Sequence, residues 1–118
     1  MNKELPLKVR NIFSDLDPII WKNEWLIVLN KLLASSEMLE IWPLLIDQAN
    51  KNKNNFPAIG NSQFLKWELK AFVAHAVKLA KENTSKSDFM SSFRDFFHSK
   101  RYIINNEQIA IIYEAINN

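Results

Sequence analysis

The longest uninterrupted helical pattern in the chain runs from Ser62 to Glu82, with the sequence SQFLKWELKAFVAHAVKLAKE. At about 100° per residue, its apolar side chains fall on one broad arc. These side chains are Leu65, Leu69, Phe72, Val73, Ala76, Leu79 and Ala80. The arc is wider than the apolar stripe of an ordinary surface helix. The pattern therefore predicts a long central helix, at about residues 62–82, that packs against several others.

Trp67 lies in the middle of the opposite arc of this helix. The polar side chains on that arc are Gln63, Lys66, Lys70, Lys78 and Lys81. A Trp among lysines supplies contact area together with positive charge, which is typical of an anchor for an acidic protein or for nucleic acid. In the alternative interpretation, the helix is covered on both sides and Trp67 belongs to the core, while the lysines reach past it to water.

Three further helices are predicted before this stretch. Helical spacing connects Leu5, Val9, Ile12, Phe13 and Leu16. The next segment, from Pro18 to Ala34, is almost wholly apolar, which predicts a buried helix. The segment from Glu37 to Asn50 contains Pro43, which removes a backbone hydrogen bond and clashes with the preceding turn. This predicts a kinked helix near Pro43, or two short helices that meet at Trp42 and Pro43.

The C-terminal third of the chain predicts two more helices. Ser85 followed by Asp88 resembles a capping box, and the aromatic inner face of the following helix is formed by Phe89, Phe93, Phe96 and Phe97. The short Tyr102–Ile104 segment is β-prone, but the sequence offers it no partner strand, so it is interpreted as a linker. Asn105 with Gln108 is predicted to cap a final helix, whose inward side chains are Ile109, Ile112, Tyr113 and Ile116.

Together these patterns predict an all-α fold. A chain of 118 residues is expected to form one domain, here residues 1–118, and to bury roughly two-thirds of its unfolded surface. We expect a compact bundle of five to seven helices. The loop from Lys51 to Asn61 holds the one glycine, and its Phe56 either docks onto the body of the protein or faces a partner.

The charges are distributed unevenly along the chain. Residues 15–47 carry six acidic side chains against two lysines, a net charge of −4, whereas residues 51–101 carry ten basic against four acidic ones, a net charge of +6. The basic half offers a surface for nucleic acid, and the acidic half offers one for a basic protein. The acidic candidates are Asp15, Asp17, Glu37 and Glu40.

The composition excludes several kinds of site. One glycine is too few for a glycine-rich phosphate loop, and without cysteine there is neither a disulfide framework nor a thiolate ligand. Two histidines without an H-E-x-x-H or E-x-x-H motif predict no metal site, and no cofactor is expected. No apolar run approaches 18 residues and the N-terminus lacks the apolar core of a signal peptide, so a cytosolic location is expected.

Arg94 and His98 are the one pair with a catalytic interpretation. They lie at i and i+4, so His98 could act as a general base while Arg94 stabilises the charge of a phosphorane. The spacing resembles the R-x(4–6)-H motif of the HEPN ribonucleases, which are helical domains, but it is one residue shorter. The resemblance is confined to these two residues. The alternative is a solvated pair near a helix end.

By elimination, the sequence predicts a protein that binds rather than catalyses. The favoured hypothesis is a small cytosolic protein-binding module of the inhibitor or immunity type that occludes a toxin, a nuclease or another enzyme. Its abundant Asn, Lys and Ile favour a bacterial or phage source. The candidate partner-binding residues are Trp67, Lys66, Lys70, Lys78, Phe56 and Trp42. The alternatives are a nucleic-acid-binding protein that uses the basic residues of 51–101, and a homodimer with Trp67 on its two-fold axis.

Overall fold

Every regular element in the described part of the chain is a helix. The computed structural model describes Asn11 and residues 23–54 and 60–117. Its helices are α2 (Asn23–Ala34), α3 (Met38–Lys53), α4 (Asn61–Lys81), α5 (Lys86–Ser99) and α6 (Asn106–Asn117). Within these ranges no residue forms a strand, so the predicted all-α bundle is confirmed.

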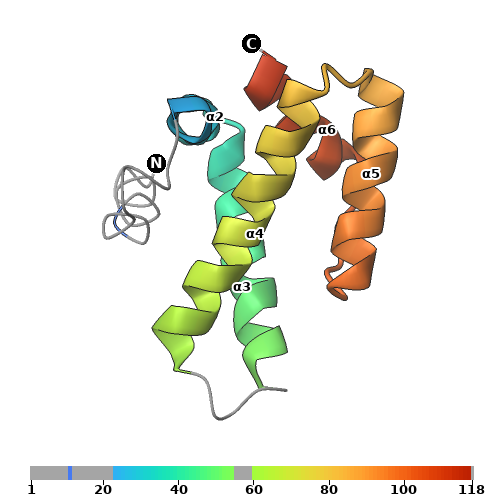
Figure 1. Cartoon of the computed structure of the whole chain (residues 1–118). Coiled ribbons are helices and arrows are strands. Elements are labelled where there is room, and N and C mark those ends of the chain that lie inside the picture. The colour runs from blue at the N-terminus through green and yellow to red at the C-terminus, as the bar shows by residue number, and fades with distance from the viewer. Residues whose placement is uncertain (1–10, 12–22, 55–59, 118) are drawn as a thin grey trace.

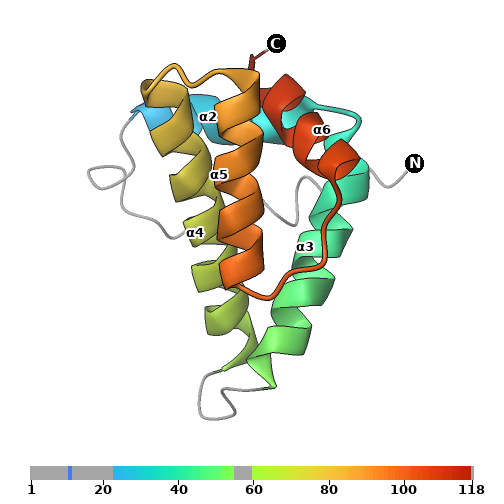
Figure 2. The same cartoon turned by 90° about the vertical axis from the view of Figure 1, so that its right-hand side faces the viewer.

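The longest of the described helices is α4, with 21 residues. α3 packs along α4, and α5 runs beside it on another side (Figures 1 and 2). α2 lies across one end, where it contacts both α4 and α6, and α6 packs against α5. α4 is therefore contacted on more than one side, while the side chains of Gln63, Trp67, Lys78, Ala80 and Lys81 remain exposed.

The core is rich in aromatic side chains. Phe72 of α4 meets Trp42 of α3 edge-on, with ring centroids 5.6 Å apart, and it also contacts Phe93 and Phe97 of α5. Trp42 is 0% exposed, so its assignment to a partner-binding surface is wrong. The physical reason is helical spacing: Trp42 shares one stripe with the buried residues Met38, Leu45 and Ala49.

The prediction of a buried helix before Ala34 is wrong for one face of α2. Val28, Leu29 and Leu32 are buried, but Leu26 is 41% exposed and Ile27 is 56% exposed. The cause is the position of α2 across one end of the bundle, where its neighbours cover a single face. The beginning of this predicted helix, from Pro18 to Lys22, and the predicted helix over residues 5–16 lie outside the described residues, except for Asn11.

α3 runs without interruption through Pro43. Two short helices meeting at this proline therefore do not occur, whereas the kink stays a prediction. The Pro43 side chain is exposed, so its ring does not disturb the core. α3 extends to Lys53, three residues beyond the predicted end at Asn50, and Phe56 lies outside the described residues.

Local interactions explain where α4 ends and where α5 begins. α4 ends where Asn83 takes φ 49°, a left-handed conformation that Asn tolerates. The Thr84 N–H then donates to the Leu79 carbonyl at 3.4 Å. At the start of α5, the Ser85 hydroxyl accepts a hydrogen bond from the Asp88 N–H at 3.2 Å, which confirms the predicted cap.

The connection from α5 to α6 is a linker, as the sequence predicts. Residues 102–105 form no helix or strand, and Arg101 takes φ 62° at the end of α5. α6 then starts with a reciprocal cap. The Gln108 N–H donates to Asn105 Oδ1 at 2.9 Å, and the Asn105 N–H donates to Gln108 Oε1 at 2.8 Å. This confirms the predicted cap.

Replacing this cap residue is expected to destabilise the fold measurably. The Asn105→Ala variant loses the side-chain acceptor for the Gln108 N–H. We expect a loss of about 1 kcal/mol in the free energy of unfolding, measured by urea denaturation. Asn105→Asp is the matched control, because its carboxylate keeps the acceptor. An Asn105→Ala variant as stable as the wild type would contradict the role of this cap.

Candidate interaction face on α4

Trp67 stands on the solvent side of α4 and is 50% exposed. It shares one side of the helix with Ala71, Ala74 and Lys78, at spacings of four, seven and eleven residues. Lys70 lies at the edge of the same side. These five residues are called the Trp67 face. The two alanines are short, so the indole rises above its neighbours on the helix.

Toward the C-terminal end of α4, side chains on both flanks of the Trp67 face are covered by other parts of the protein. On one flank Val77 is buried and Lys81 forms an ion pair with Glu24 of α2. On the other flank His75 packs against Phe93 and Phe96 of α5. The Trp67 face lies between these two contacts. The interpretation of Trp67 as a core residue is therefore wrong.

The Trp67 face carries the positive charges of Lys70 and Lys78. Lys70 is half-buried and Lys78 is exposed, and neither forms an ion pair with a carboxylate within the described ranges. Other lysines in the described ranges do form ion pairs with carboxylates: Lys51–Asp47, Lys81–Glu24, Lys86–Glu114 and Lys100–Glu68. A partner with acidic side chains around an indole pocket would complement this face.

Glu68, the residue after Trp67, connects this turn of α4 to Lys100 and Tyr102 at the end of α5. The Tyr102 hydroxyl donates to Glu68 Oε2 at 2.6 Å, and Lys100 Nζ lies 3.4 Å from Glu68 Oε1. Burial, with the adjacent carboxylate, raises the pKa of Tyr102 far above its usual value, so the phenol remains a donor. Asn52 also donates to the Lys100 carbonyl at 2.7 Å. These bonds fix the linker against α4 and α3, beside the turn of Trp67.

The predicted partner-binding residues thus divide into three groups. Trp67, Lys66, Lys70 and Lys78 all lie on α4, with Lys66 and Lys70 half-buried. Trp42 belongs to the core. Phe56 lies outside the described residues.

The alternative acidic face is described only in part. Glu37 and Glu40 are exposed at the start of α3, whereas Asp15 and Asp17 lie outside the described residues. A hydrogen bond from its own backbone N–H lowers the pKa of Glu37, and the Ser35 hydroxyl, 3.2 Å from Oε2, lowers that pKa further. Glu37 therefore stays ionised near neutral pH.

A contact between His75 and Ser92 is the feature that the sequence did not reveal. His75 Nε2 lies 3.0 Å from Ser92 Oγ, and the imidazole stacks on Phe96 with centroids 4.7 Å apart. Ser92 is 17 residues further along the chain, so local spacing gave no signal. Both residues lie inside helices, where backbone N–H groups are already bonded, so the pair has no backbone oxyanion donors. We interpret this pair as a structural contact between α4 and α5.

Folding stability is expected to fall in mild acid because of His75. Burial lowers the pKa of His75 below 6.5, and the positive charge of Lys78 lowers it further. The unfolded chain then binds more protons, so stability rises with pH across this interval. The contribution of His75 is fully present above the unfolded pKa and is lost as pH falls through the folded pKa. Urea denaturation across this range should show a flatter pH dependence for His75→Gln; an unchanged slope would contradict the assignment.

Arg94 and His98 do not face a common cleft with a carboxylate in any pocket that the structure describes. The Arg94 guanidinium donates to Asn106 Oδ1, from Nη2 at 2.9 Å and from Nε at 3.2 Å, and so connects α5 to α6. His98 is exposed. The arrangement gives Arg94 a structural role, and the ribonuclease hypothesis gains no support from it.

Two features of the described residues bear on the class of the site. No group of three or more His, Asp or Glu side chains among them is placed to hold a metal ion. None of the described helices combines the length and the apolar content needed to cross a membrane. Comparison of the chain with protein-family models, with curated proteins and with solved structures finds no match.

Proposed function

We propose that this chain is a cytosolic protein-binding module of the inhibitor or immunity type, and that the Trp67 face occludes a toxin, a nuclease or another enzyme. The observation that carries the proposal is the half-exposed Trp67 on α4, beside two lysines without a carboxylate partner among the described residues. We further propose that α4 is the central helix of the bundle and that it presents the Trp67 face to the partner.

Energetic considerations support Trp67 as the anchor. Trp is among the residues enriched at binding hot spots, because its large ring fills a pocket and excludes water. Trp67 is presented by a helix whose adjacent turn is fixed through Glu68, Tyr102 and Lys100, so little ordering is required on binding. The charges of Lys70 and Lys78 would steer an acidic partner toward the ring.

The contacts of the basic side chains favour a protein partner over nucleic acid. Of the ten basic side chains in residues 51–101, Lys51, Lys81, Lys86 and Lys100 are in ion pairs, and Arg94 is bonded to Asn106. The charge of each of these four lysines is already offset by a nearby carboxylate, which weakens its attraction for a phosphate. Nucleic-acid affinity depends on many such contacts.

The test is inhibition of the protein encoded next to this chain. The purified chain should form a complex with that protein and abolish its activity at a stoichiometric ratio, at moderate salt. A neighbour that is neither bound nor inhibited would contradict the inhibitor proposal. Binding to a labelled duplex or RNA that weakens steeply with salt would instead favour the nucleic-acid alternative.

A further inference from the structure

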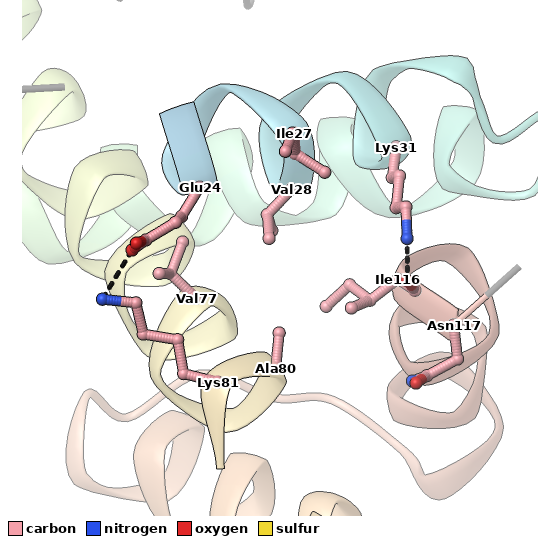
Figure 3. A pocket seen from close by; sticks show the side chains of 9 residues that line it. All are labelled: Glu24, Ile27, Val28, Lys31, Val77, Ala80, Lys81, Ile116 and Asn117. Carbon is pink, nitrogen blue, oxygen red and sulfur yellow. Dashed lines mark hydrogen bonds and ion pairs between the residues drawn. The ribbon is translucent and has the colours of Figure 1, made fainter. Parts of the chain in front are cut away.

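A shallow groove opens between α2 and the C-terminal ends of α4 and α6 (Figure 3). Its apolar side chains are Ile27, Val28, Val77, Ala80 and Ile116. Its volume, about 280 Å³, lies just below the range of about 300–1,000 Å³ for small-molecule pockets. The shape and lining are better suited to side chains of a neighbouring helix than to an enclosed ligand.

Four of the lining residues come from one face of α2. Glu24, Ile27, Val28 and Lys31 occupy positions i, i+3, i+4 and i+7, the spacing of a helix-packing stripe. Ile27, in the middle, is 56% exposed. An acidic side chain stands at one end of the stripe and a basic one at the other, as Figure 3 shows.

Intramolecular contacts orient both charged ends. Glu24 pairs with Lys81 of α4, and Lys31 Nζ donates to the Ile116 carbonyl at 3.1 Å. An ammonium group has three N–H donors, and a carboxylate accepts several hydrogen bonds. Each end therefore keeps the capacity for an additional partner while its position is held.

We propose that the groove is occupied by α2 of a second copy of this chain, packed antiparallel across a two-fold axis between Ile27 and Val28. Seven residues of helix span about 10.5 Å, so Glu24 of one copy would lie opposite Lys31 of the second copy, and Lys31 opposite its Glu24. The stripe is thus complementary to itself, as an isologous interface requires. Ile27 of each copy enters the groove of the other. This surface is separate from Trp67 and does not depend on the proposed function.

Charge reversal tests the pairing directly. Sedimentation should show a dimer for the wild-type chain and monomers for Glu24→Lys and for Lys31→Glu, because each single change places like charges opposite each other. An equal mixture of the two single variants should form heterodimers, since one chain then presents two positive charges at the ends of its stripe and the other chain presents two negative ones.

Two more variants complete the design. Ile27→Asp should be monomeric, and Glu40→Lys, which makes the same charge change outside the groove, should remain dimeric. Circular dichroism identifies any variant that fails to fold. If either single charge variant does not fold, Ile27→Asp still tests the interface. A monomeric wild type, a dimer that survives Ile27→Asp, or single variants that do not associate on mixing would each overturn the proposal.

Discussion

The Phe93→Ala variant is expected to lose about 3–5 kcal/mol of the free energy of unfolding. Phe93 is 0% exposed, and five aromatic rings surround it at centroid distances of 4.7–5.9 Å. These rings belong to Phe72, His75, Phe89, Phe96 and Phe97. Truncation leaves a cavity between α4 and α5 that such rigid rings cannot fill. Because small domains have only about 5–15 kcal/mol of stability, much of the total would be lost.

Phe96→Ala is the matched control on the same helix. Phe96 is half-buried and contacts His75 and Lys100 at the edge of the core, so its truncation should cost clearly less. Phe93→Leu retains most of the volume and should fall between the two, which gives a value even if Phe93→Ala does not fold. Urea denaturation followed by circular dichroism measures all three. Equal losses for Phe93→Ala and Phe96→Ala would contradict the assigned core.

The second large effect is expected at the Trp67 face. Trp67→Ala should weaken binding of the protein partner by a factor of about 30 or more, which corresponds to about 2 kcal/mol. The free energy of unfolding should change much less than for Phe93→Ala, because half of the Trp67 side chain is in solvent. Isothermal titration calorimetry and urea denaturation measure the two quantities on the same samples.

A control variant separates anchoring from general surface hydrophobicity. Ile103, on the linker between α5 and α6, is 79% exposed, more than Trp67. Ile103→Ala should leave the affinity unchanged. If Ile103→Ala and Trp67→Ala weaken binding equally, Trp67 is not a specific anchor.

Local signals in the sequence were sufficient for the caps and for the helical class. Ser85 with Asp88 and Asn105 with Gln108 are each three residues apart, so the backbone geometry of one turn determines the contact. Trp42 is different: its helical stripe with Met38, Leu45 and Ala49 is itself a pattern that indicates burial. For Trp67, periodicity placed the ring opposite the apolar arc but left open whether another helix covered it.

The contacts between helices could not be predicted in this way. His75 meets Ser92, Tyr102 meets Glu68, and Lys31 reaches Ile116, which are 17, 34 and 85 residues apart in sequence. Each depends on how segments far apart in the sequence pack together, which periodicity within one helix does not determine. For the same reason, an apolar composition before Ala34 predicted full burial, whereas the position of α2 at one end leaves Ile27 in solvent.

Fluorine NMR of the chain labelled with 5-fluorotryptophan tests the central claim, that Trp67 is an exposed anchor which a partner covers. Trp67→Phe assigns the Trp67 resonance, and Trp42, fully buried, serves as the internal reference. In the free chain, the Trp67 resonance should shift between H₂O and D₂O while that of Trp42 does not. On addition of the protein partner, the solvent shift of Trp67 should disappear. A Trp67 resonance insensitive to solvent in the free chain, or equally sensitive in the complex, would contradict the account.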